Sequence, residues 1–331
     1  MKIVFNTGYV SMYGKDVCKH HCRTGGVLKE LGVNIKRFID LYGQEDNLYL
    51  RVCTTKDVWK ILKEEYSFVS HPSVLFLDYQ EVLKKQNLTK NEYWYDALRF
   101  QIFSTLEEVE DCLEYWIDED ALVEDNNLLD LCRANSDVVI SPIDNYPWDR
   151  PEIQKDLQEY KDIFTSFGLK ASPKPEDYTN TGTFFGGPSK YVKKLSTKIL
   201  EVERAFKRDT QPSAAVLEYI SCSCIREFCN NLNIPYSPLD LNKYVWHYTC
   251  YRLPVQAYSA LWIQYPEDVE YFRNFYDKRT ELFRLSYVNE AFKLILSEDT
   301  SKFSEPFWKE LAVRLYVNYK SYFHSRKYYL V

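Results

Sequence analysis

Two carboxylates are placed where they can hold a divalent cation. Asp118 and Asp120 follow the apolar run 115–117, which predicts a short strand. Side chains two positions apart in an extended chain lie on the same side. At the carboxyl end of a strand in an α/β sheet, they face the crevice in which ligands bind. Carboxylate oxygens suit magnesium and manganese, which can bridge a diphosphate, so we expect Asp118 and Asp120 to bind Mn²⁺ or Mg²⁺.

A solvated acidic turn is the alternative explanation for this pair, because Asp-x-Asp is common by chance. The flanking residues favour the metal site. An apolar run precedes the two acids, and the apolar residues 121–123 follow them. Buried segments on both sides would tether the acids to the edge of a sheet.

The first half of the chain alternates β-like and helical segments. Short apolar runs predict strands over residues 2–6, 48–53, 74–77, 115–117 and 137–140. Apolar residues at helical spacing predict helices over residues 27–41, 57–65, 93–105 and 106–113. This order predicts an α/β fold with a mostly parallel, Rossmann-like sheet flanked by helices. The second half is mainly helical in pattern, over residues 152–167, 190–206, 213–232 and beyond 266.

A helix with an arginine, followed by this strand and acid pair, resembles a known family. Residues 96–100 and 116–123 look like the corresponding segments of the GT-A fold glycosyltransferases. The resemblance implies that Arg99 approaches the donor sugar or its phosphates, whose oxygens match the planar guanidinium. A surface ion pair with Asp96 is the alternative. The resemblance also implies a catalytic domain over residues 1–254, with a nucleotide-sugar half (1–142), an acceptor half (143–254) and a helical extension over 255–331.

A second segment, residues 180–188, is similar to the Asn-x-Gly-x-x-x-Gly-Gly segment of glycogenin-like and blood-group-type transferases. In that family it lies beside the transferred sugar. The residues that this similarity places there are Asn180, Thr181, Gly182, Gly186 and Gly187. Paired glycines allow backbone to come close to a ligand. A plain turn before the next helix is the alternative, because Gly-Gly-Pro is common in turns.

The catalytic residues depend on whether the reaction retains or inverts the sugar configuration. Asp209 and Gln211 resemble the family element near the anomeric carbon and would serve a retaining enzyme, although Pro212 departs from the pattern. A helix N-cap is the alternative there. In an inverting enzyme, Asp144 or Asp149 would be the general base, with the acceptor near Trp148. The Gly-Gly segment favours retention.

The remaining candidates lie near the two ends of the predicted catalytic domain. In some relatives a histidine at the place of His247 is the third metal ligand; a structural role is the alternative. Thr7, Gly8 and Tyr9 would cradle the nucleotide, with Tyr9 stacking on the base. Basic residues further along the chain would contact the diphosphate, namely Lys15 and Arg23. The Cys and His residues between 18 and 22 lack a second pair of ligands, which argues against zinc.

The composition bears on the expected partners, disulfides and cellular location of the protein. The net charge is −6 without a long Lys/Arg block, so nucleic acid is not an expected partner. Nine cysteines are a poor disulfide framework. The N-terminus reads as a strand, not a signal peptide, and no apolar run approaches the roughly 20 residues of a membrane span. We expect a cytoplasmic protein, bacterial or from a large virus.

The predicted function is metal-dependent transfer of a sugar from a UDP- or GDP-sugar to a hydroxyl of a glycan, a glycoprotein or a lipid-linked acceptor. Two alternatives stay open. A nucleotidyltransferase acting on sugar phosphates would use a similar fold, but the loop after the first predicted strand is only loosely glycine-rich. A sugar-binding protein without activity would not need both Asp118 and Asp120.

Overall fold

The computed structural model describes residues 1–10, 27–93, 97–119, 121–123, 127–143, 151–171, 179, 181–209, 214–241 and 244–246. The predicted helical extension over 255–331 lies outside these ranges, so its boundary stays a prediction. None of the helices within them is long and apolar enough for a membrane span.

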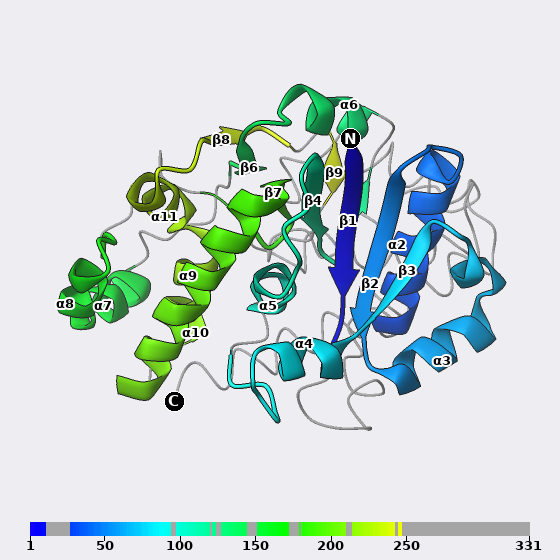
Figure 1. Cartoon of the computed structure of the whole chain (residues 1–331). Helices are drawn as coiled ribbons and strands as arrows, with labels where there is room; N and C mark the ends of the chain where they lie inside the picture. Colours follow the sequence, from blue (N-terminus) through cyan, green and yellow to red (C-terminus); the bar gives the residue numbers. More distant parts are fainter. Residues whose placement is uncertain are drawn as a thin grey trace, which may run out of the picture.

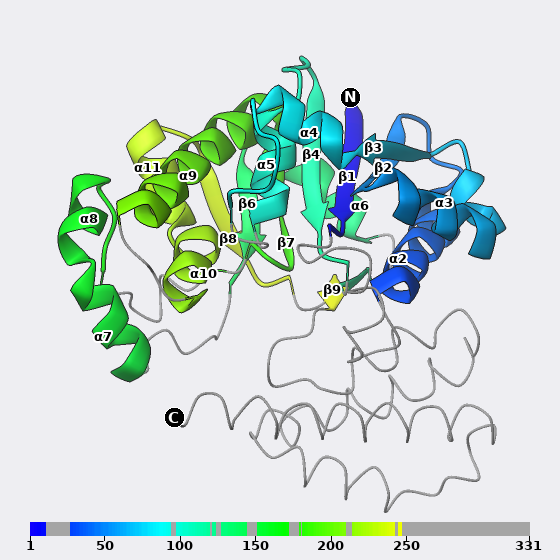
Figure 2. The same cartoon turned by 90° about the horizontal axis from the view of Figure 1, so that it is seen from below.

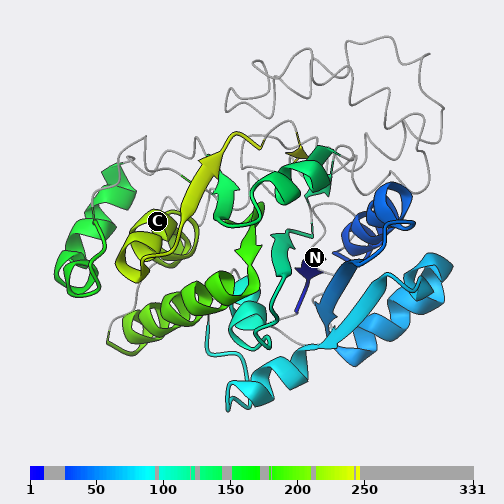
Figure 3. The same ribbon diagram turned by 45° about the horizontal axis from the view of Figure 1, so that its top comes forward.

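Seven strands of the described ranges form one sheet in the order β3-β2-β1-β4-β7-β6-β8. All pair in parallel except β7, which is antiparallel to β4 and β6. Figure 3 shows the sheet running from the cyan β3 past the dark blue β1 to the yellow β8. The strands are β1 (Lys2–Gly8), β2 (Leu48–Thr54), β3 (Val74–Asp78), β4 (Cys112–Ile117), β6 (Val139–Pro142), β7 (Phe184–Pro188) and β8 (Tyr236–Leu239). The predicted mostly parallel α/β sheet is confirmed.

Helices cover both faces of this sheet. Figure 2 shows α4, α5 and α9 on one side and α2 on the other, and Figure 1 labels these helices. The helices are α2 (Val27–Tyr42), α3 (Lys56–Glu65), α4 (Tyr79–Lys85), α5 (Leu98–Ser104), α6 (Asn127–Ala134), α7 (Pro151–Glu159), α8 (Lys161–Ser166), α9 (Ser189–Asp209), α10 (Ala214–Cys222) and α11 (Ile225–Leu232). A short 3-10 helix, η1 (Ser67–Ser70), follows α3.

Two aromatic cores form because neighbouring strand residues face opposite sides. Phe185 packs against Phe100 and Phe103 of α5, with ring centroids 5.7 and 5.8 Å apart. Its neighbour Phe184 stacks on Tyr115 on the other face, at 5.4 Å. All six residues of β4 are buried. Continuous burial is typical of a central strand with helices on both faces.

Three predicted helices differ from those observed. Residues 106–113 are not helical, because Asp111 has a left-handed φ of 58° and Cys112 begins β4. The apolar residues 106, 109 and 113 have helical spacing, but pairing of β4 with two strands outweighs this local pattern. The predicted helices 152–167 and 213–232 each divide in two, into α7 and α8 and into α10 and α11.

The cysteines of the described ranges are free, buried thiols. Cys222 ends α10 and Cys224 precedes α11, and both side chains pack in the core. Burial raises the pKa of the Cys112 thiol to about 11 and that of Cys229 to about 12. These two thiols therefore stay protonated near neutral pH and act as small apolar side chains.

A buried ion pair joins the three strands at the centre of the sheet. Arg51 of β2 contacts both carboxylate oxygens of Glu114 of β4, at 3.0 and 3.3 Å. Between them lies Asn6 of β1, which donates to Glu114 at 2.8 Å and accepts from Arg51 at 2.8 Å. The side chain of Glu114 is 5% exposed. Removing one charge would leave the other desolvated without compensation.

Glu114→Gln is expected to lower the free energy of unfolding by about 3 kcal/mol, because the charge of Arg51 would lose its partner in a largely buried environment. Denaturant unfolding followed by circular dichroism measures this loss. The matched control is Asp40→Asn, which removes the exposed partner of Lys36 on α2 and should cost less than about 1 kcal/mol. Equal losses in the two variants would contradict a structural role for the Glu114 network.

Candidate functional site

The strand order reverses between β1 and β4. From β1 the chain proceeds to β2 and β3 on one side, whereas β4 lies on the other side of β1. In open α/β sheets, ligands bind at the carboxyl ends of strands where the order reverses in this way. Thr7 and Gly8 end β1, and Asp118 directly follows β4. The structure therefore brings these three predicted site residues to one edge.

The backbone of Asp118 is held from two sides. Its amide donates to the carbonyl of Thr183 at 3.2 Å, just before β7. Its carbonyl accepts from the side chain of Asn34 in α2 at 2.7 Å and from the amide of Ala121 at 3.1 Å. One carboxylate oxygen accepts from the amide of Glu119 at 3.2 Å. Asp118 is half-buried, and these bonds hold its backbone at the edge of the sheet.

Asn34 is a site-supporting residue that the sequence analysis missed. It is 3% exposed and also donates to the carbonyl of Ala121 at 3.2 Å. Its neighbours Leu31, Ile35 and Phe38 belong to the apolar core. A polar residue on the buried face of a predicted amphipathic helix was the signal that could have identified it.

The residues after Asp118 are tethered as the sequence predicted. The short strand β5 (Leu122–Val123) pairs antiparallel with β9 (Val245–Trp246), with Leu122 opposite Trp246. The carbonyl of Val123 also accepts from Arg37 of α2 at 2.9 Å. Val245 and Trp246 are thus brought beside residues 122–123, although more than one hundred residues separate the two strands in sequence.

Thr7, Gly8 and Tyr9 lie at the end of β1 as expected. The hydroxyl of Thr7 is fully buried and has no hydrogen-bond partner among the residues that the structure describes. A Cβ at Gly8 would lie 2.4 Å from the carbonyl oxygen of Cys53, so only glycine fits beside β2. The carbonyl of Tyr9 accepts from Thr54 at 2.8 Å. The stacking of Tyr9 on a base stays a prediction.

Arg99 is buried, which contradicts the alternative of a surface ion pair. It is 2% exposed, and its guanidinium contacts the hydroxyl of Thr181 through Nε at 3.3 Å and Nη2 at 3.1 Å. The carbonyl of Gly182 accepts from the indole of Trp116 at 3.0 Å. Thr181 and Gly182 therefore lie at the same edge as Asp118, and the predicted contact of Arg99 with a donor stays a prediction.

Gly186 and Gly187 lie inside β7, where they are opposite Tyr115 and Glu114. A Cβ at Gly186 would lie 2.2 Å from the carbonyl oxygen of Glu114, and one at Gly187 would lie 2.4 Å from that of Val138. Close packing between strands therefore explains both glycines. They are deeper in the sheet than Thr181 and Gly182, and their contact with a sugar stays a prediction.

Several predicted site residues lie outside the described ranges, namely Lys15, Arg23, Asp120, Asp144, Trp148, Asp149, Asn180, Gln211 and His247. Asp209 was expected to open the helix after it, but it is the last residue of α9. The described ranges contain no group of three or more His, Cys, Asp and Glu side chains that could hold a metal. Of the three predicted metal ligands, only Asp118 falls within them.

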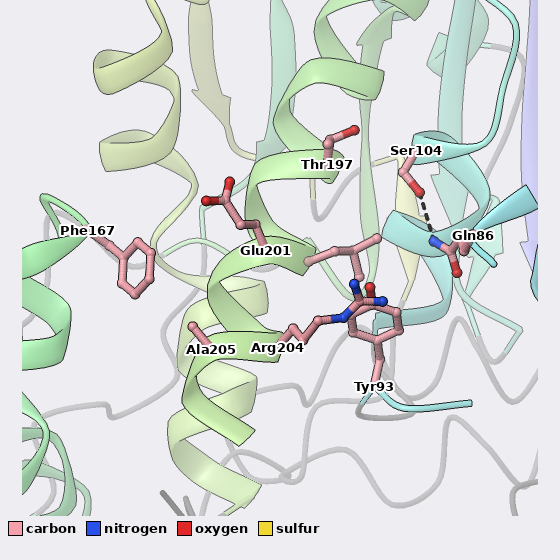
Figure 4. A pocket seen from close by; sticks show the side chains of 9 residues that line it. Gln86, Tyr93, Ser104, Phe167, Thr197, Glu201, Arg204 and Ala205 are labelled. Carbon is pink, nitrogen blue, oxygen red and sulfur yellow. Dashed lines mark hydrogen bonds between the residues drawn. The ribbon is translucent and has the colours of Figure 1, made fainter. Parts of the chain in front are cut away.

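A groove of about 530 Å³ lies elsewhere, across the outer side of α9. Figure 4 shows Thr197, Glu201, Arg204 and Ala205 of that helix among its lining. Arg204 lies over the ring of Tyr93, 5.2 Å from its centroid. The groove includes none of the predicted site residues.

No protein-family model and no curated protein sequence matches the chain. Solved glycosyltransferases are similar to it in fold. Mouse xyloside xylosyltransferase 1, in its apo form, matches with a TM-score of 0.43 and 14% identity over 73% of this chain and 86% of that protein. An active-site mutant of LgtC matches with a TM-score of 0.41 and 12% identity, over 72% of each chain. The WbbM bifunctional glycosyltransferase matches with a TM-score of 0.40 and 11% identity, over 75% of this chain and 46% of that protein.

Asn34→Ala is expected to destabilise the protein by about 2 kcal/mol, because the carbonyls of Asp118 and Ala121 each lose a donor from a buried side chain. Thermal and urea unfolding measure the change. Asn231→Ala is the matched control, since Asn231 also lies in a helix and donates to two carbonyls, but at an exposed position. It should change stability by less than about 0.5 kcal/mol. Equal losses of stability in the two variants would contradict a stabilising role for the hydrogen bond between Asn34 and Asp118.

Proposed function

We propose that this chain is a metal-dependent glycosyltransferase whose donor binds at the carboxyl edge of β1 and β4. The pairing of β5 with β9 carries the proposal. Trp246 lies opposite Leu122, and His247 follows Trp246 directly. Asp120 precedes Leu122 by two residues. Consecutive Cα atoms are about 3.8 Å apart, so this register would allow His247 to reach the acid pair.

Two carboxylates and an imidazole are a suitable set of ligands for manganese or magnesium. Asp118, Asp120 and His247 would hold the ion, and its charge would stabilise the negative charge of the departing nucleoside diphosphate. The bonds from Asn34, Ala121 and Thr183 keep Asp118 in place before any ligand arrives. A carboxylate on a fixed backbone loses less conformational entropy when it binds.

The end of β1 would receive the nucleotide. The position of Thr7 and Gly8 at the switch point of the strand order supports this. Tyr9 would stack on the base, and Lys15 and Arg23 would contact the phosphates. Thr181 and Gly182, which lie at the same edge, would flank the sugar together with Asn180.

We favour a retaining reaction, in which Asp209 or Gln211 lies near the anomeric carbon. An inverting reaction would instead use Asp144 or Asp149 to remove the proton of the acceptor hydroxyl. Trp148 would bind the acceptor, which is a glycan, a glycoprotein or a lipid-linked sugar. The configuration of the product, determined by NMR spectroscopy, decides between the two assignments.

The protein is expected to release nucleoside diphosphate when it is incubated with manganese and a UDP- or GDP-sugar. A panel of such donors, with coupled detection of the released nucleotide, tests this expectation. Chelation with EDTA should abolish release, and added manganese should restore it. Release of pyrophosphate from a sugar phosphate and a nucleoside triphosphate would instead indicate a nucleotidyltransferase.

Asp118→Asn and Asp120→Asn are each expected to reduce turnover by at least about 100-fold, because a bound metal contributes several kcal/mol to the stabilisation of the transition state. Their thermal midpoints should stay close to that of the wild type, since Asn has the same shape as Asp. Asp130→Asn, which changes an exposed acid on α6, serves as the control and should keep full turnover. Retained turnover in Asp120→Asn would contradict the metal assignment.

A further inference from the structure

Three segments meet at the hydroxyl of Thr181. Arg99 of α5 contacts this oxygen through two nitrogens, and its Nη2 also lies 3.4 Å from the carbonyl oxygen of Ser221 and 3.3 Å from the sulfur of Cys222. The hydroxyl of Thr181 itself donates to the carbonyl of Ser221. Both Arg99 and Thr181 are almost completely buried. One guanidinium thus connects α5, the segment 181–183 and the end of α10.

The chain just before Thr181 is fixed to the same turn. Thr179 donates through its hydroxyl to the carbonyl of Cys222 at 3.1 Å. The hydroxyl of Ser223 donates back to the carbonyl of Thr179 at 3.3 Å. The turn between α10 and α11 therefore holds this segment through two hydrogen bonds to Thr179. Arg99 of α5 adds a contact with Thr181 from the other side.

Each of the three residues 181–183 transmits this constraint to a different group. Thr181 accepts from Arg99, the carbonyl of Gly182 accepts from the Trp116 indole, and the carbonyl of Thr183 accepts from the amide of Asp118. Trp116 lies in β4, and Asp118 is the first residue after this strand. A displacement of Thr181 would therefore displace the backbone of Asp118, the predicted metal ligand.

We propose that Arg99 is a positioning residue, which holds residues 181–183 and through them Asp118. The resemblance to GT-A enzymes implies a direct contact with the donor, but the contacts of the guanidinium favour a role through Thr181. Arginine suits this role because its planar guanidinium presents five N–H donors in fixed directions, whereas the three donors of a lysine ammonium radiate from one nitrogen. The consequence for turnover rests on the proposed function, whereas the tether itself does not.

The tether can be measured without any substrate. The indole N–H resonance of Trp116, assigned by its disappearance in Trp116→Phe, reports the hydrogen bond to Gly182. Arg99→Lys and Thr181→Val are each expected to shift this resonance, because both release Thr181. Thr181→Ser keeps the hydroxyl and should leave the resonance at its wild-type position. An unchanged resonance in both Arg99→Lys and Thr181→Val would overturn the proposal.

The kinetic consequence is tested by a double-mutant cycle on donor turnover. Arg99→Lys and Thr181→Val should each lower kcat/KM on the order of tenfold, and the double variant should lose no more than either alone, because the two residues act as one unit. Losses that multiply would show that Arg99 acts directly on the substrate, and the positioning role would be rejected.

The two proposals fail in different ways. A wild-type protein that releases no nucleotide from any donor contradicts the proposed function, and the indole resonance then decides the positioning role by itself. Should Thr181→Val not fold, as judged by circular dichroism, Arg99→Lys is still expected to shift the indole resonance and Thr181→Ser to leave it unchanged. A shift in Thr181→Ser equal to that in Arg99→Lys would count against the proposal.

Discussion

The candidate site depends on the hydrogen bonds that fix the end of β4. This strand is buried over its whole length between β1 and β7, and helices cover both of its faces. Asp118 is the first residue beyond it, and its amide and carbonyl are both bonded to other segments. A buried backbone group must find a partner or lose a large part of its stabilisation. The partners of Asp118 therefore determine where its backbone lies.

Those partners come from opposite directions. Asn34 reaches Asp118 from α2, on one face of the sheet, and Thr183 reaches it from the segment before β7. Thr181 and Gly182 of that segment are held in turn by Arg99 and Trp116, which belong to the other face. The edge between β1 and β4 is thus supported by both helical layers. This arrangement holds the backbone of Asp118 although it lies at the edge of the sheet.

Polar groups buried within the sheet follow two different patterns. Arg51, Glu114 and Asn6 satisfy one another and bind three strands together. Thr7, one residue after Asn6, has a buried hydroxyl without a partner in the described part of the chain. A satisfied network is consistent with a structural role, whereas an unsatisfied group at a topological switch point is typical of a ligand site. The change from one pattern to the other occurs where β1 approaches its carboxyl end.

The sequence by itself determined the α/β class, the strand before Asp118 and the tethering of residues 121–123, because these follow from local hydrophobic patterns. It could not show that Gly186 and Gly187 lie within a strand, that Arg99 is buried against Thr181, or that Asn34 holds the carbonyl of Asp118. Nor could it show that residues 106–113 avoid a helix, since the competing strand pairs come from distant parts of the chain. These features depend on contacts between residues up to 123 positions apart, and only the tertiary structure decides which distant groups meet.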